Sequence, residues 1–323
     1  MSTPSSAAST RGASPAAALR HPASRRGFLL VVLAALCWGT SGLSGRVVAD
    51  RSDLSALDIA WWRLAIGAVV LLAAWGLTAR RRATTVAVTR PVAVRLALVG
   101  AGLAAYQLAY FSAVARAGVS IATLVALGLA PLLIAVGAAL LGHGRPSRTT
   151  VAALVVAVAG LTLLVGVSAG ADRGTAVLLG TLMASGSALG YAVVTLAGGG
   201  VPAGVPVTLV GFGGGALLLT PAVLAAGIAV PTDPVAVAVL LYLGFVPSAL
   251  AYGLFFTGVR TVPGAVASIV TLLEPLTATA LATAFLGERL APAAVAGGLL
   301  LLAAVAGLYL RELGRAPEAD GRL

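Results

Sequence analysis

The chain has 323 residues, of which 59% are hydrophobic and only 10% are charged, and its mean hydropathy is +1.04. This composition excludes an ordinary soluble domain and indicates an integral membrane protein. The formal net charge is +11. Because every basic residue is an arginine and most lie in loops beside apolar runs, membrane sidedness explains the charge, and no nucleic-acid partner is expected.

Residues 1–26 are rich in Ser, Ala, Pro and Arg and have no apolar period. We expect a disordered cytoplasmic tail here, and a second, short cytoplasmic tail over residues 311–323. The apolar run after the first tail is too long for a signal peptide, and further runs follow it. Cys37 is the single cysteine, which leaves no disulfide or cysteine metal site within one chain.

Ten apolar runs are long enough to cross about 30 Å of hydrocarbon, a distance that takes roughly 20 helical residues. In chain order they are 27–48, 57–78, 91–113, 119–141, 149–167, 174–196, 206–229, 234–258, 263–286 and 292–310. The connections between them are short, which leaves no room for a separate soluble domain. The predicted fold is therefore an all-α membrane protein with ten transmembrane helices.

Part of the sequence occurs twice. Pro131 follows Arg116 by fifteen residues in an apolar stretch, and Pro275 follows Arg260 by fifteen residues in another. The match continues through the end of each run and into the next one. A duplicated unit of apolar helices is typical of carriers more than of any other class.

The duplication predicts two repeats of five helices each, residues 27–167 and 174–310. Because five is odd, the second repeat begins on the opposite side of the membrane, so the two repeats are inverted. Loop arginines favour an orientation with both termini in the cytoplasm, in a multi-pass protein of the plasma membrane. Two inverted halves can rock between outward-open and inward-open states, so we expect alternating access.

Several short motifs carry a resemblance to a known family. In chain order they are Trp38-Gly39-Thr40-Ser41-Gly42, Trp62-Arg63-Leu64-Ala65, Leu141-Gly142 after Pro131, and Leu273-Glu274-Pro275 running to Leu286-Gly287-Glu288-Arg289-Leu290. Over about residues 28–310 the chain resembles the drug/metabolite transporter superfamily, and within it the EamA-type permeases. It departs from the pattern at His143, where the family has glutamate. The resemblance implies ten helices, a central cavity between the halves, and export or exchange of small metabolites.

Two charged residues lie well inside the apolar runs, Arg63 in the second and Glu274 in the ninth. Charge at membrane depth is rare and by default marks a functional site. Glu274 aligns with Ala130 in the other repeat and Arg63 roughly with Gly211, so the fold can be built without either charge. Glu274 could exchange a proton or bind a cationic group of the substrate. Alternatively, Arg63 and Glu274 form a fixed pair that only joins two helices.

Polar and aromatic side chains recur along the helices at positions that could share one face. The candidates for substrate contact are Trp38, Tyr106, Gln107, Tyr191, Tyr252 with Phe256, and Thr271. In the resembled family these helices line the central cavity. Gln107 is the only glutamine, and an amide in hydrocarbon needs a partner. The alternative is that these side chains fill helix interfaces and bond to neighbouring carbonyls.

The two prolines of the repeated segment, Pro131 and Pro275, interrupt backbone hydrogen bonding at matched positions. We expect a matched pair of kinks there that act as hinges. The many glycines within the runs favour close helix packing.

These features together favour a secondary transporter. An enzyme is disfavoured because no histidine, aspartate pair or Cys/His cluster lies within the runs, so neither a catalytic residue nor a metal site or cofactor is predicted. A channel is disfavoured because there is no charged ring or filter-like repeat. The expected cargo is an amino acid or related metabolite, moved by export and coupled in one hypothesis to a proton gradient. The alternative is a multidrug or nucleotide-sugar type carrier, and the protein could work as a monomer or a homodimer.

Overall fold

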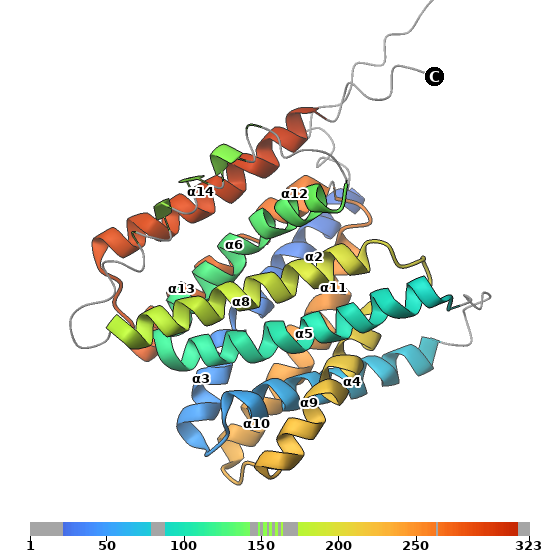
Figure 1. The fold of residues 1–323 in the computed structure, drawn as a ribbon, viewed down its shortest axis with the longest axis vertical. Coiled ribbons are helices and arrows are strands. Elements are labelled where there is room, and N and C mark those ends of the chain that lie inside the picture. The colour runs from blue at the N-terminus through green and yellow to red at the C-terminus, as the bar shows by residue number, and fades with distance from the viewer. Residues whose placement is uncertain are drawn as a thin grey trace, which may run out of the picture.

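The computed structural model describes residues 22–78, 88–142, 174–262 and 264–315, with isolated positions between 148 and 163. Throughout these residues the regular structure is helical and contains no strand (Figure 1). Most of the predicted fifth run, residues 149–167, lies outside the described residues, as do residues 1–21 and 316–323. The first helix begins at Pro22 and the last ends at Arg315, so each extends into a segment that the sequence assigned to a tail.

The first half of the chain forms five described helices. They are α2 (Pro22–Gly39), α3 (Ser41–Arg51), α4 (Ala56–Thr78), α5 (Arg90–Ala117) and α6 (Val119–Leu140). The first predicted run is therefore two helices with a break at Thr40. The Thr40 hydroxyl donates to the Cys37 carbonyl at 2.7 Å and lies 3.0 Å from the hydroxyl of Tyr242 in the second half, and these bonds stabilise the interruption.

The second half forms eight described elements. They are α8 (Gly174–Gly198), α9 (Val207–Ala226), α10 (Pro234–Gly244), the π-helical turn η2 (Phe245–Leu250), α11 (Ala251–Gly258), α12 (Gly264–Val270), α13 (Leu273–Leu286) and α14 (Pro292–Arg315). The eighth predicted run thus contains a π-helical turn at Pro247, whose missing N–H weakens the regular hydrogen-bond ladder. The ninth run is divided at Thr271 and Leu272.

Seven helical stretches of the described residues are long and apolar enough to cross a membrane. They include α2 with α3 as one span and α10 to α11 as another. Helix α13 has only 14 residues, because the break before Leu273 shortens it. The all-helical membrane architecture agrees with the sequence prediction, whereas the predicted number of ten spans is not established.

The two halves pack against each other along α5 and α8, which lie side by side and antiparallel (Figure 1). A Cβ atom on Gly190 of α8 would lie 2.7 Å from the Tyr106 nitrogen and 2.8 Å from the Gly102 carbonyl oxygen of α5. Only a residue without a side chain allows the backbones to approach this closely. The same arrangement brings one face of α5 and one of α8 to the centre of the molecule.

A second contact between the halves is made by Glu288, which follows α13. Its carboxylate oxygens accept the N–H groups of Val119 at 2.7 Å and Ser120 at 3.0 Å, in the first turn of α6. Gly118 precedes this turn with a φ of +83°, and a Cβ atom there would lie 2.7 Å from Glu288 Oε1. Glu288 therefore caps a helix of the other half, which is the favourable place for a negative charge.

In the repeated segment the counterpart of Glu288 is His143, and the counterpart of Val119 is Pro263. A proline has no backbone N–H to donate and a histidine carries no carboxylate. The sequence at the corresponding positions therefore cannot form the same cap. In the sequence, the departure of His143 from the family pattern therefore coincides with the absence of a backbone N–H donor at residue 263.

Candidate functional site

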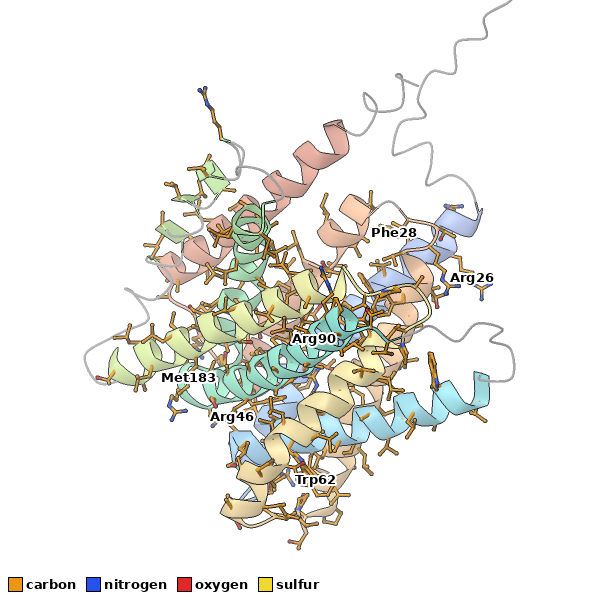
Figure 2. The ribbon with its side chains drawn as sticks, turned by 45° about the vertical axis from the view of Figure 1, so that its right-hand side comes forward. Arg26, Phe28, Arg46, Trp62, Arg90 and Met183 are labelled. Carbon is orange, nitrogen blue, oxygen red and sulfur yellow. The ribbon has the colours of Figure 1, made fainter. Side chains whose placement is uncertain are left out.

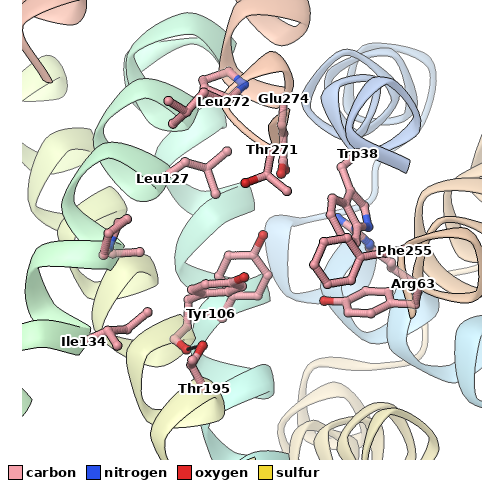
Figure 3. Close-up of a pocket in the computed structure, with 15 residues that line it drawn as sticks. Trp38, Arg63, Tyr106, Leu127, Ile134, Thr195, Phe255, Thr271, Leu272 and Glu274 are labelled. Atoms are coloured by element: carbon pink, nitrogen blue, oxygen red, sulfur yellow. Dashed lines mark hydrogen bonds between the residues drawn. The ribbon is translucent and has the colours of Figure 1, made fainter. Parts of the chain in front are cut away.

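A central cavity of about 210 Å³ lies between the two halves (Figure 3). Side chains from both halves line it, and they are Trp38, Arg63, Tyr106, Leu127, Ala130, Pro131, Ile134, Tyr191, Thr195, Tyr252, Phe255, Thr271, Leu272, Glu274 and Pro275. All predicted candidates except Gln107 and Phe256 are in this set. The structure thus gathers residues from distant parts of the sequence, while their roles in transport stay predictions.

The predicted place of Gln107 on the cavity differs from its place in the structure. Its side chain is 1% exposed and packs within the helix bundle, and its Oε1 atom has no hydrogen-bond partner among the described residues. Gln107 directly follows Tyr106, and successive helical residues are rotated by about 100°. Because Tyr106 points into the cavity, Gln107 points into the packing beside it.

The second predicted residue that lies away from the cavity is Phe256, which is 50% exposed and does not line the cavity. The preceding residue, Phe255, lines it instead and had not been singled out from the sequence. Both i+3 and i+4 positions fall near the face of Tyr252, so periodicity alone does not distinguish Phe255 from Phe256.

Helix α4 places Arg63 at the cavity with only 4% of the residue exposed. Its Nε donates to the hydroxyl of Ser248 at 3.1 Å, and its guanidinium carbon lies 5.8 Å from the ring centre of Phe111. The Ser248 hydroxyl in turn donates to the Leu243 carbonyl at 2.9 Å. Arg63 is thus held by a polar contact from η2 and a cation–π contact from α5.

The π-helical turn is the local feature that positions Ser248. Ser248 is fully buried, and its bond to Leu243 spans five residues, the spacing of a π-turn. The offset that aligns Arg116 with Arg260 aligns Ser248 with Ala104, in the unbroken helix α5. Ser248 therefore belongs with Arg63 and Glu274 among the polar residues that have no polar counterpart in the other repeat.

Glu274 reaches the cavity from the first turn of α13. Helix α2 passes closely beside it, because a Cβ atom on Gly39 would lie 2.6 Å from the Thr277 Cβ and 2.9 Å from the Glu274 carbonyl oxygen. This approach sets Trp38, the residue before Gly39, against the same cavity (Figure 3). Pro275, at the third position of α13, suits the first turn of a helix because its missing N–H would have no intrahelical acceptor there.

Arg63 and Glu274 line one cavity without forming an ion pair. In the described part of the chain the only ion pair within 4.0 Å joins Arg46 and Asp50 at 3.0 Å. Neither the Glu274 carboxylate nor the outer guanidinium nitrogens of Arg63 are among the buried polar atoms that lack partners in the described residues. Both side chains line the cavity wall, and a direct ion pair between them is not the arrangement observed in the described residues.

Aromatic rings form two walls of the cavity. The Trp38 ring lies 5.2 Å from both Tyr252 and Phe255, and the Tyr106 ring lies 5.6 Å from Tyr191, measured between ring centres. Tilted and edge-to-face contacts at these distances are favourable and hold the rings in place. The site thus combines rigid apolar walls with a carboxylate and a guanidinium.

Both symmetry-related prolines line the cavity, but their helices differ. Helix α6 runs unbroken past Pro131, whereas the ninth run breaks into α12 and α13 before Pro275. The kinks are therefore not matched in this state, and a hinge role for either proline stays a prediction.

Comparison with known proteins gives consistent matches. The sequence pattern of the EamA-like transporter family matches residues 25–166 and again residues 176–310. A protein of Bacillus subtilis (strain 168) named "Uncharacterized transporter YwfM" is 30% identical over 244 residues, which cover 73% of this chain and 77% of that protein. A crystal structure described without an activity is 25% identical, with coverage of 89% of this chain and 98% of that one and a TM-score of 0.59.

Proposed function

Since the chain belongs to the EamA-like transporter family of membrane transporters, we propose that it is a secondary carrier for a small zwitterionic metabolite. The cargo is an amino acid or a related compound, and it is exported across the plasma membrane by alternating access. The observation that carries this proposal is the pair of opposite charges, Arg63 and Glu274, which line one cavity without a direct ion pair between them.

The two charges match the two ends of a zwitterion. The outer guanidinium nitrogens of Arg63 can donate to a carboxylate, a pairing that the planar guanidinium favours. The Glu274 carboxylate can accept from an ammonium group. A charge in the membrane is costly without a partner, so a ligand that supplies both opposite charges is stabilised relative to one that supplies neither.

The size and walls of the cavity favour a small amphipathic cargo. Its volume of about 210 Å³ is smaller than the roughly 300–1,000 Å³ of sites for drug-sized ligands. This difference favours an amino acid or related compound over the multidrug and nucleotide-sugar alternatives. The rings of Trp38, Tyr106 and Tyr252 offer flat apolar surface for a side chain of the cargo.

Glu274 also provides a means of coupling to a proton gradient. Its carboxylate can hold either a proton or the ammonium group of the cargo, but not both. Competition between the two at one site would link export of cargo to entry of a proton. The inverted repeats expected from the sequence would supply the two access states, with both termini in the cytoplasm.

The proposal is tested with purified protein in liposomes, first by a counterflow screen of amino acids and related zwitterions. We expect saturable flux that is accelerated by cargo on the opposite side and driven by an imposed pH gradient. Glu274→Gln and Glu274→Ala should both abolish this flux although the protein still inserts. Asp53→Asn, at an exposed loop position, is the matched control and should transport normally.

Two results would contradict the proposal. Flux that neither saturates nor shows counterflow would indicate a channel. Normal, pH-driven transport by Glu274→Gln would remove the role of Glu274 in proton coupling. Comparing exported metabolites between a deletion strain and an overexpressing strain would then identify the cargo class.

A further inference from the structure

A groove of about 630 Å³ lies away from the central cavity, where α5 begins and α8 ends. Its walls are apolar side chains from α5, α8 and the end of α6, among them Val94, Leu98, Leu141, Val193 and Leu196. Two arginines, Arg90 and Arg95, also line it, and Figure 2 marks Arg90 at the start of α5. The groove shares no lining residue with the central cavity.

The two arginines of the groove have no acidic partner in the part of the chain that the structure describes. The chain contains no aspartate or glutamate between residues 59 and 171, and neither arginine forms an ion pair within the described residues. The Arg95 guanidinium lies against Gly200, two residues after the end of α8. Arg90 and Arg95 therefore give this end of the groove positive charge.

The apolar wall is open to the surroundings of the protein. Val94, Leu98 and Leu141 are 53%, 47% and 64% exposed. An exposed apolar wall in a membrane protein faces hydrocarbon, and unpaired arginines at its end face the headgroup region. A ligand that fits both parts has an acidic headgroup and an apolar chain.

We propose that this groove is a binding site for an anionic phospholipid. The headgroup phosphate lies between Arg90 and Arg95, and an acyl chain lies along Val94, Leu98 and Leu196. Because α5 comes from the first half and α8 from the second, the bound lipid contacts both halves at their main interface. The inference does not depend on the cargo or on the mechanism of transport.

The test is lipid binding to the purified full-length protein, measured by native mass spectrometry during titration with phosphatidylglycerol or phosphatidylcholine. We expect phosphatidylglycerol to bind about 25-fold more tightly, since each of the two arginines near an acidic lipid contributes on the order of a fivefold preference. The variant Arg90→Gln with Arg95→Gln should lose this preference. The matched control, Arg116→Gln with Arg289→Gln, removes two arginines of a different pocket and should keep it.

Two further variants distinguish lipid binding in this groove from general attraction of anionic lipid to positive charge, and they test whether a loss of binding reflects misfolding. Leu98→Trp fills the exposed wall and should weaken binding of both lipids, whereas Arg95→Lys keeps the charge and should retain the preference. Equal binding of the two lipids by the wild type would overturn the proposal. So would unchanged phosphatidylglycerol binding in Leu98→Trp or in the double glutamine variant.

Discussion

Removing the carboxylate of Glu288 should destabilise the protein by uncapping helix α6. The helix has Gly118 at its N-cap and no side-chain cap of its own, so Glu288 supplies the acceptor for Val119 and Ser120. In Glu288→Ala these two N–H groups lose their partner. The contact between the second half and the first turn of α6 is lost with them.

The magnitude follows from the two hydrogen bonds and the helix dipole. A hydrogen bond to a charged group contributes about 1.5–3 kcal/mol, but Glu288 is half-buried and water replaces part of the lost bonding. Loss of an N-cap alone typically costs about 1 kcal/mol and up to about 2, and the charge at the helix start adds about 0.3–1 kcal/mol. We therefore expect a loss of about 2 kcal/mol, which for a chain of this size corresponds to about 4 °C in Tm.

The assay is thermal unfolding of the detergent-purified protein, followed by tryptophan fluorescence. Arg289→Ala changes the exposed neighbour of Glu288 and should leave the Tm within about 1 °C of the wild-type value, as surface substitutions usually do. Gly118→Ala should be destabilised as strongly as Glu288→Ala, because its added Cβ meets the Glu288 carboxylate and its φ is unfavourable for alanine. A wild-type Tm in Glu288→Ala would refute the capping role.

Other outcomes can be predicted from single contacts. Gly190→Ala should reduce the folded yield severalfold in detergent size-exclusion chromatography, because the added Cβ would overlap the backbone of α5. The control Gly186→Ala, whose Cβ would have only one atom 4.0 Å away, should be tolerated. Equal yields of the two variants would contradict the close packing of α5 and α8. Ser248→Ala should raise the KM for cargo about tenfold with little change in maximal rate, because Arg63 loses the acceptor that orients it and a hydrogen bond to a charged group is worth about 1.5–3 kcal/mol. Transport kinetics in liposomes measure this, and a loss of rate at unchanged KM would contradict a positioning role. Arg63→Lys should raise KM at least as much, since lysine keeps the charge but not the fork of donors.

The class of the protein and most of its helices follow directly from the amino-acid order. A membrane span needs a run of apolar residues set by the bilayer thickness, and such runs are visible without knowing what they touch. The bounds of α4, α6 and α8 agree with the predicted runs to within about one turn. The rarity of charge at membrane depth likewise marked Arg63 and Glu274 before any contact was known.

The breaks within the helices could not be predicted from the sequence, because the apolar runs continue through them. Nothing in the hydropathy separates α2 from α3 at Thr40, or α12 from α13 before Leu273. At the break, the Thr40 hydroxyl bonds to the Cys37 carbonyl and also meets the hydroxyl of Tyr242, about two hundred residues away. Whether a backbone leaves the regular ladder depends on partners that other helices provide.

The direction and the partners of each side chain are decided only by the tertiary structure, because they depend on how each helix is rotated and on which helices cross it. Local periodicity placed Gln107 and Phe256 on the cavity, yet packing turns both away from it. The sequence also left two partners open for Arg63, the cargo or Glu274. Only the tertiary structure brings Ser248 to the Nε of Arg63 and places Glu274 in the cavity wall. The physical reason is that these contacts join separate helices, so the sequence of any one helix does not determine them.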